Sequence, residues 1–413
     1  MRAPVHGLRP LLEIPAVKVF AQKLAQLREP LERENLSPAL AEKIYGPVLK
    51  SSVSRLEEFA QCPFRFFVHV GLRAEERKTF ELDARERGSF QHEILKEFHD
   101  GLVAENKRWR DLAPAEARDR ISRIAAALAP VYRAGLLRAD HQSRFAARVL
   151  TVALQDFVAT LVGWMRGQYG FDPAKAETGF GLDDSSLPAW EIDLGKGRQL
   201  ALRGRVDRID LCHAGDHSLA VVVDYKSSAR RLDKVLIEHG VQLQLLAYLA
   251  AVRRWPAGFL GAKKIVPAGV FYVNLRGQFE GGASRDEVLA DAEASGRLAY
   301  RHTGRFDAAC LDQLDRPRAR DQFNYTLNSN GTVRSNSTEA LGGKEFIALL
   351  DEVEAQLRRL GERIFSGAAG VDPYCKGAAK ACDYCDYRAV CRIDDWTHKF
   401  RELRAVEGEG PES

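Results

Sequence analysis

Two short stretches decide how this chain folds around its chemistry. Residues 204–210 read Gly-Arg-Val-Asp-Arg-Ile-Asp, and residues 221–228 read Val-Val-Val-Asp-Tyr-Lys-Ser-Ser. Both are short, rich in Val and Ile and bounded by turn residues, a pattern typical of β-strands. Gly215 and Asp216 stand between them and are well suited to a tight turn. The two stretches therefore predict an antiparallel hairpin with a defined register.

That register places Asp207 directly opposite Asp224, with Cβ atoms about 5 Å apart on one face. Lys226 follows Asp224 by two residues and projects from the same face. Two buried carboxylates repel each other, and a divalent cation such as Mg²⁺ relieves that conflict with hard oxygen ligands. The alternative is an Asp–Lys ion pair on a surface hairpin. The apolar residues 221–223 before Asp224 favour a buried strand and hence the metal site.

The whole chain has the composition of an ordinary soluble globular protein, with 413 residues, 45% hydrophobic, 29% charged and a net charge of +4. This charge balance alone does not indicate nucleic acid. The N-terminus lacks a signal-peptide core and the chain lacks an uninterrupted apolar run of membrane-spanning length, so we expect a cytoplasmic protein without a membrane partner. The seven cysteines favour metal or cluster ligation over disulfides. Gly342-Gly343-Lys344 lacks the first glycine and the final Ser/Thr of a P-loop, so the sequence does not support ATP hydrolysis at such a loop.

Two further segments supply candidate site residues. Ser54 is the expected N-cap of a helix that ends at Cys62. A later helix with Ser89 as its N-cap is expected to carry His92 at the edge of an apolar stripe. Such a histidine is usually structural, but His92 could give a nitrogen ligand to the metal, with His99 as the competing candidate. A second helix, residues 241–250, places Gln244 and Tyr248 one above the other. These two could anchor the Lys226 strand or touch a phosphate.

The cysteines gather near the end of the chain. Cys382, Cys385 and Cys391 follow the spacing C-x2-C-x5-C, which is a strong signal for a soft-metal site. Three thiols need a fourth ligand, and both Cys62 and Cys375 qualify on spacing alone. A four-cysteine site holds either zinc or an iron–sulfur cluster.

These segments together resemble one family, the C-terminal nuclease domain of the bacterial helicase–nuclease protein AddB, in the RecB-like branch of the PD-(D/E)XK nucleases. Six motifs appear in order over about residues 45–395. They are Ser52-x-Ser54-Arg55-Leu56 with Cys62-Pro63-Phe64, Gly88-x3-His92, residues 204–210, Asp224-Tyr225-Lys226, Gln244-x3-Tyr248, and Cys382-x2-Cys385-x5-Cys391. A full family member is far longer, so the chain is expected to be a fragment, a stand-alone product or a truncated relative.

The resemblance implies an α/β fold with a restriction-endonuclease-like core, a mixed central sheet flanked by helices. The expected domains are a helical lead-in or the remnant of an upstream domain at 1–50, a nuclease domain at 51–395 with a helical insertion at about 105–170, and a polar tail at 396–413. It also implies site roles. His92, Asp207, Asp224 and the Tyr225 carbonyl bind Mg²⁺, Lys226 orients or activates water, and Gln244 and Tyr248 support the site. A [4Fe–4S] cluster is held by Cys62, Cys382, Cys385 and Cys391.

The expected function is Mg²⁺-dependent cleavage of DNA phosphodiesters, on single strands or at duplex ends, beside a helicase–nuclease partner of the AddA type. Phosphodiester cleavage requires a Lewis acid at the phosphoryl oxygen and a nucleophile opposite the leaving group, which this residue set can provide. Two alternatives are a decayed nuclease that acts as a DNA-binding scaffold, and a stand-alone nuclease similar to Cas4. The complete Asp/Asp/Lys set argues against the first, and the long helical insertion argues against the second.

Overall fold

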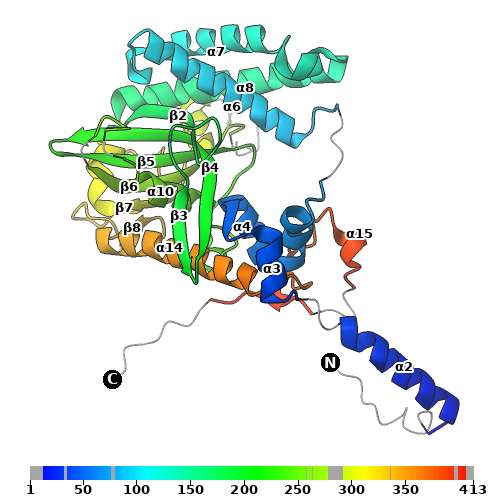
Figure 1. Cartoon of the computed structure of the whole chain (residues 1–413). Coiled ribbons are helices and arrows are strands. Elements are labelled where there is room, and N and C mark those ends of the chain that lie inside the picture. The colour runs from blue at the N-terminus through cyan, green and yellow to red at the C-terminus, as the bar shows by residue number, and fades with distance from the viewer. Residues whose placement is uncertain are drawn as a thin grey trace, which may run out of the picture.

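We analysed a computed structural model of the chain, which describes residues 13–31, 35–75, 80–256, 258–262, 264–277, 292–334, 336–394 and 399–405. A mixed sheet lies between two layers of helices (Figure 1). The predicted α/β class with a flanked mixed sheet is thereby confirmed. The expected tail at 396–413 is described only for residues 399–405, and residues 1–12 and 32–34 of the expected lead-in lie outside the described ranges.

The large sheet follows the order β1-β4-β5-β6-β7-β8, with β2 and β3 also paired to β4. Its strands are β1 (Val48–Ser52), β2 (Asp172–Phe180), β3 (Trp190–Gly195), β4 (Arg198–Ala214), β5 (His217–Lys226), β6 (Ile265–Asn274), β7 (Thr303–Asp307) and β8 (Ala340–Leu341). The long strand β4 is the centre of this arrangement. Its first half pairs with β1 and β3, and its second half pairs with β2 and β5.

The hairpin β4–β5 has the predicted register. Its ladder runs from Ala214 opposite His217 to Arg208 opposite Val223, and the turn lies at Gly215, whose φ is +64°. Asp207 and Asp224 are the next pair outward along this register. Alternation along β5 then sorts its residues between two cores. Ala220 and Val222 belong to one, and Val221, Val223 and Tyr225 belong to the other.

The first core is covered by α4 (Val53–Gln61), α10 (Gln244–Val252) and α14 (Gly343–Phe365). Helix α10 is buried along most of its length, as its run of Leu and Ala residues requires. Helix α14 is amphipathic and buries Phe346, Leu350, Val353 and Leu357 at the spacing of one helical face. All three helices pack into this first core, and therefore lie on the same side of the sheet.

The second core lies beneath α6 (Ala84–Ala104), α7 (Pro114–Leu128) and α8 (His141–Gly167). The predicted helical segment within about 105–170 is thus present, and Figure 1 shows it stacked on the sheet face opposite α14. Among the described helices, α8 has the length and composition of a membrane span. Its Leu154, Phe157, Val158 and Leu161 are fully buried in the second core, where they pack as in the central helix of a globular domain.

Two helices begin earlier than their sequences predict. The sequence favours Ser54 and Ser89 as N-caps, and both predictions are wrong. Helix α4 is capped by Ser52, whose Oγ accepts from the Arg55 N–H at 3.3 Å, and Ser54 lies inside the first turn. Helix α6 begins at Ala84 with Asp83 as its N-cap. In both cases an earlier side chain accepts a backbone N–H of the first turn, so the helix begins before the predicted cap.

The other elements connect these layers or extend from them. They are α2 (Pro15–Leu31), α3 (Pro38–Tyr45), α5 (Pro63–Phe66), η2 (Phe67–Gly71), η3 (Trp109–Asp111), η4 (Tyr132–Arg138), α9 (Lys234–Glu238), α12 (Ala292–Ala299), η5 (Ala308–Cys310), α13 (Leu311–Leu314) and α15 (Arg388–Cys391). A second sheet, β10-β9-β11, is formed by β9 (Tyr374–Lys376), β10 (Ala379–Lys380) and β11 (Arg401–Glu402).

Candidate active site

The two carboxylates of the hairpin are buried at the end of its ladder. Asp207 is 9% exposed and Asp224 is 2% exposed. Asp207 Oδ2 accepts a hydrogen bond from the Tyr225 backbone N–H at 2.8 Å, which joins the two strands where the regular pairing ends. Asp224 shares its sheet face with Val222 of the first core. The hairpin prediction therefore placed both acids correctly, close to each other and away from bulk solvent.

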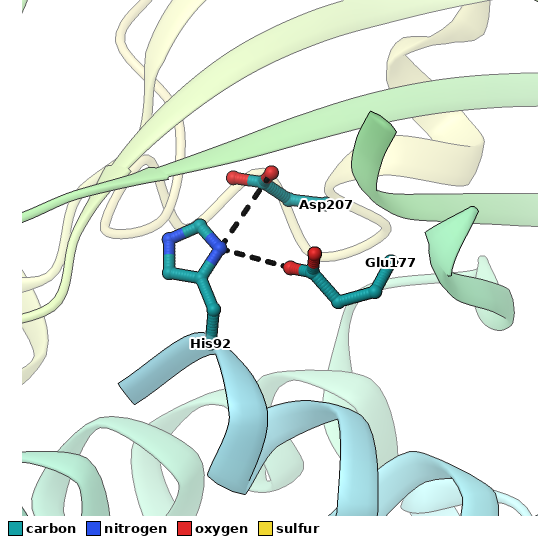
Figure 2. A group of neighbouring side chains, drawn as sticks. All are labelled: His92, Glu177 and Asp207. Carbon is teal, nitrogen blue, oxygen red and sulfur yellow. Dashed lines mark hydrogen bonds and ion pairs between the residues drawn. The ribbon is translucent and has the colours of Figure 1, made fainter. Parts of the chain in front are cut away.

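His92 and Glu177 complete a group around Asp207. His92 Nδ1 lies 2.8 Å from Glu177 Oε1 and 3.6 Å from Asp207 Oδ1, as Figure 2 shows. One ligand atom from each of the three residues lies within 4.8 Å of the others, so this group could hold a metal ion. The three come from α6, β2 and β4, so the group joins the helical layer to the centre of the sheet.

Burial and the crowded negative charge of this group together leave the pKa values of Asp207 and His92 raised. Burial, reinforced by the neighbouring Asp224 carboxylate, raises the pKa of Asp207 to about 7. Burial lowers the pKa of His92, but the charges of Asp207 and Glu177 outweigh that effect and raise it to about 9. In the absence of a metal, protons on His92 and Asp207 offset the crowded negative charge. A divalent cation would replace them.

Lys226 and Tyr225 occupy the end of β5 beside the carboxylates. The Lys226 ammonium forms an ion pair with Asp224 Oδ2, an oxygen of a side chain that is 2% exposed. The same ammonium lies 5.8 Å from the centre of the Tyr272 ring. The Tyr225 contact with Asp207 is made by its N–H, whereas the sequence singled out its carbonyl. The chain thus brings a flexible cation against the second carboxylate of the pair.

Gln244 and Tyr248 are brought together on α10 as their spacing predicts. Gln244 Nε2 donates to the Tyr248 hydroxyl at 3.1 Å, and the negative charges of Asp224 and Asp207 act on that phenol. Glu57 Oε1 accepts the backbone N–H groups of Leu243 and Gln244 at 2.6 and 2.7 Å, so α4 fixes the start of α10. Burial raises the pKa of Glu57 to about 7 despite these bonds.

A buried ion pair supports the hairpin from the opposite face. Arg208 Nε lies 2.8 Å from Asp210 Oδ1, and the two residues are 1% and 0% exposed. Arg208 Nη1 also donates to the Tyr225 hydroxyl at 2.9 Å, and Asp210 Oδ2 accepts from the Tyr169 hydroxyl at 2.8 Å. Tyr225 is therefore fixed twice. Its hydroxyl is hydrogen-bonded to Arg208 on one face of the sheet, and its backbone N–H donates to Asp207.

Sequence reasoning missed Glu177 as a site residue. The pairs on either side, Ala176 with Arg208 and Thr178 with Val206, bring Glu177 opposite Asp207. Its φ of +46° is unusual for a residue with a side chain, so the strand is distorted at this position. His99, the competing candidate, is buried and has a structural role. His99 is 3% exposed, and its Nδ1 accepts from Trp109 Nε1 at 3.2 Å.

The cysteines form no disulfide, since all seven are free. Burial, together with the charges of Cys62, Cys385 and Cys391, raises the pKa of Cys382 to about 11. Burial likewise raises the pKa of Cys62, with a contribution from Cys385. The early cysteine therefore lies within electrostatic range of two of the late ones. Cys375 lies in β9, opposite Lys380 and Glu402 of its neighbouring strands.

Comparisons with known proteins agree with this geometry. The B-subunit of the ATP-dependent helicase/deoxyribonuclease of Desulforamulus reducens is 32% identical over 375 residues, which cover 90% of this chain and 32% of the relative. Proteins of the same name from Moorella thermoacetica and Symbiobacterium thermophilum are 34% and 35% identical, over 87% and 86% of this chain and 31% and 30% of theirs. The chain thus spans about a third of the length of these relatives. Residues 50–392 match the PD-(D/E)XK nuclease superfamily, and the chain belongs to that superfamily.

Proposed function

We propose that this chain is a Mg²⁺-dependent deoxyribonuclease that cleaves phosphodiester bonds of single-stranded DNA. The observation that carries the proposal is the convergence of His92, Glu177 and Asp207 beside the Asp224–Lys226 ion pair. Membership of a nuclease superfamily supports hydrolysis of DNA, and superfamily members generally use a divalent metal. The proposed metal ligands are His92, Asp207, Asp224 and the Tyr225 carbonyl, with Glu177 added by the structure.

The donor set fits a hard divalent cation. It offers carboxylate oxygens from Glu177, Asp207 and Asp224 and one imidazole nitrogen from His92, and the Asp224 carboxylate is paired with the Lys226 ammonium. The raised pKa values of Asp207 and His92 also support a cation site, because a bound cation would displace the protons that these groups carry. Mg²⁺ bound here would supply Lewis-acid polarisation of a phosphoryl oxygen and a more acidic bound water.

The remaining residues of the site have positioning and charge roles in this proposal. Lys226 holds a positive charge beside Asp224, where it can orient water or balance the charge that develops on the phosphate. Tyr225 fixes the Asp207 carboxylate through its N–H. Gln244 and Tyr248 line the neighbouring end of α10 and can donate to the DNA backbone.

The four cysteines are proposed to hold a [4Fe–4S] cluster. The support is the C-x2-C-x5-C spacing of Cys382, Cys385 and Cys391, together with the position of Cys62 in the fold, whose charge contributes to the raised pKa of Cys382. These residues would fasten the C-terminal segment to the end of α4, which is a structural role. A zinc ion held by the same thiols is the competing assignment, and metal analysis of anaerobically purified protein separates the two.

The names of the relatives support a place in a larger assembly. They are named as one subunit of an ATP-dependent helicase/deoxyribonuclease, and each is about three times as long as the match to this chain. We propose that this nuclease unit acts in the cytoplasm on DNA ends unwound by an ATP-driven partner of the AddA type, in the processing of double-strand breaks.

An end-labelled single strand tests the nuclease assignment directly. Wild-type protein is incubated with Mg²⁺ and, in parallel, with EDTA, beside the Lys226→Ala variant. Cleavage in Mg²⁺ that disappears in EDTA and in the variant supports the proposal. Binding of the strand without cleavage under every condition would favour a decayed, DNA-binding module instead.

A further inference from the structure

A polar pocket of about 310 Å³ opens beside the N-terminus of α4. Serine, arginine and histidine side chains supply most of its wall, namely Ser52, Ser54, Arg55, Arg65, His69 and Arg85. They come from the start of α4, from the segment after Cys62 and from the first turn of α6. The pocket is therefore a meeting point of three parts of the chain, and none of these residues belongs to the metal-binding group.

The charge of the pocket is positive after its internal pairs are taken into account. Glu58 is engaged by Arg55 at 3.0 Å and lies 3.1 Å from His69. The remaining charged residues of the wall are two cations, Arg65 and Arg85, and one anion, the exposed Asp386. An anion that enters the pocket therefore meets more positive than negative charge.

Two guanidinium groups in the wall retain unused donors. Arg65 Nη1 donates to Gln61 Oε1 at 3.1 Å, but Arg65 Nε is buried without a hydrogen-bond partner. Within the described ranges, which exclude residues 76–79, the Arg85 guanidinium has no hydrogen bond or ion pair. Buried donors are normally satisfied, so an unused one beside a polar pocket indicates a missing acceptor. Arginine forks match phosphate oxygens in geometry as well as in charge.

The pocket lies close to the proposed metal site. Arg85 and His92 are seven residues apart on α6, so they occupy the same face of the helix about 10 Å apart along its axis. Along a B-form strand, a rise of about 3.4 Å per nucleotide makes that distance about three nucleotides. A strand held in the active site thus has a phosphate within reach of Arg85.

We propose that this pocket binds a phosphate group of the DNA strand a few nucleotides from the cleaved bond. The inference rests on the proposed nuclease function and adds to it a second anchoring point that sets how far the strand enters. The free N–H groups at the start of α4 add a favourable field for the anion. The ligand is either an internal phosphodiester or a terminal phosphate, which share the same chemistry.

The cysteine segment closes one side of the pocket. Tyr387 lines it, lies 6.1 Å from the His69 ring and donates its hydroxyl to the Ala74 carbonyl at 2.8 Å. Tyr387 falls between Cys385 and Cys391 in sequence. Whatever metal the thiols hold would therefore order this wall, which links the cysteine region to the path of the DNA.

Binding without cleavage tests the pocket. The full chain is titrated in EDTA, over a series of salt concentrations, against a short labelled oligothymidylate that carries a 5′-phosphate, a 3′-phosphate or hydroxyls at both ends. The variants are Arg85→Gln and a matched control, Arg123→Gln, which removes the same charge from the exposed face of α7. Arg85 is exposed, so its substitution leaves the fold intact.

We expect Arg85→Gln to weaken binding roughly tenfold, since it removes a charge-assisted contact. It should also reduce the slope of log affinity against log salt by about 0.7, the value for one single-strand phosphate contact. Arg123→Gln should change neither quantity. Equal effects with all three oligonucleotides identify an internal phosphodiester, and an effect confined to one phosphorylated end identifies a terminal phosphate.

Wild-type affinity and salt slope in Arg85→Gln, with every oligonucleotide, would overturn the inference. Mg²⁺-dependent cleavage by the wild type would then still support the nuclease proposal. Conversely, an Arg85 effect on binding without any cleavage by the wild type would leave the pocket in place and remove the nuclease function. The two failures are therefore distinguishable.

Discussion

The carboxylate site and the cysteine region use opposite donor chemistries and are assembled in different ways. The first gathers oxygen and nitrogen donors on β4, β5, β2 and α6, around a hairpin whose register places two acids together. We propose that the second gathers soft thiols from positions 62 and 382–391, which the packing of the C-terminal segment against α4 brings into one neighbourhood. On this proposal the sheet sets the chemistry, whereas the cysteines hold distant segments in place. Changes at one region should therefore leave the other largely intact.

Removal of a hairpin carboxylate should give the largest effect. Asp224→Ala deletes a buried acid and leaves the Lys226 ammonium without its partner. We expect cleavage of single-stranded DNA to fall roughly a thousandfold, equivalent to about 4 kcal/mol of transition-state stabilisation. Asp216→Ala, in the exposed turn of the same hairpin, is the control. Unchanged metal content at the cysteines is also expected, and a parallel loss there would show that the two regions are not separable.

Substitution of the early cysteine should affect stability more than chemistry. Cys62→Ser removes the contribution of α4 to the thiol group, which we expect to lower the free energy of unfolding by about 3 kcal/mol, as for a lost crosslink. Urea unfolding followed by circular dichroism measures this change. Cys375→Ser is the matched control and should behave as wild type. The reverse ranking of the two variants would place the fourth ligand at Cys375.

Glu177 belongs to the group that the structure brings together, but it is not among the ligands that the sequence motifs imply. Glu177→Gln keeps the side-chain size but removes a charge 2.8 Å from His92 Nδ1. We expect the affinity for Mg²⁺ to fall between roughly tenfold and a hundredfold, the range found when a partner of a metal ligand is lost. Calorimetric titration measures it, with Glu191→Gln on β3 as a control. Equal affinities in Glu177→Gln and wild type would exclude Glu177 from the metal site.

The smallest effect expected is on the pH dependence of stability. The folded-state pKa of Asp207 is about 7 and that of His92 about 9, both above their unfolded values, so the folded protein binds protons more tightly. The stabilisation is present below the unfolded pKa values and is lost as pH rises through 7 and then 9. The melting temperature of metal-free protein should therefore fall by a few degrees between about pH 6 and pH 9. Asp207→Asn should show a flatter profile, and an unchanged slope in that variant would contradict the assignment.

Much of the site could be predicted because its parts are local. Gly215 and Asp216 define the hairpin register, which in turn pairs Asp207 with Asp224, and the four-residue spacing of Gln244 and Tyr248 brings them together on α10. Glu177 could not be found in this way. Strand β3 lies between β2 and β4 in sequence, so no short turn fixes their register, and the backbone of Glu177 is distorted.

The helix starts and the cysteine group show the same limit. Ser54 and Ser89 are good capping residues, but Ser52 and Asp83 cap earlier because the chain enters each helix from a preceding segment whose path the sequence does not reveal. The contact of Glu57 with the start of α10 joins residues far apart in the chain. For the thiols, spacing leaves Cys62 and Cys375 equivalent, and the proposal favours Cys62 because its charge contributes to the raised pKa of Cys382, an effect of long-range packing.

Titration of the metal-free protein with Mn²⁺, followed by electron paramagnetic resonance, tests the central claim most directly. Mn²⁺ is a spectroscopic substitute for Mg²⁺ that prefers the same oxygen-rich ligands. If His92, Asp207 and Asp224 converge on one cation, the wild type and Cys391→Ser will each bind Mn²⁺ at this site, and Asp207→Asn will lose it. Mn²⁺ binding by Asp207→Asn with wild-type affinity would contradict the account.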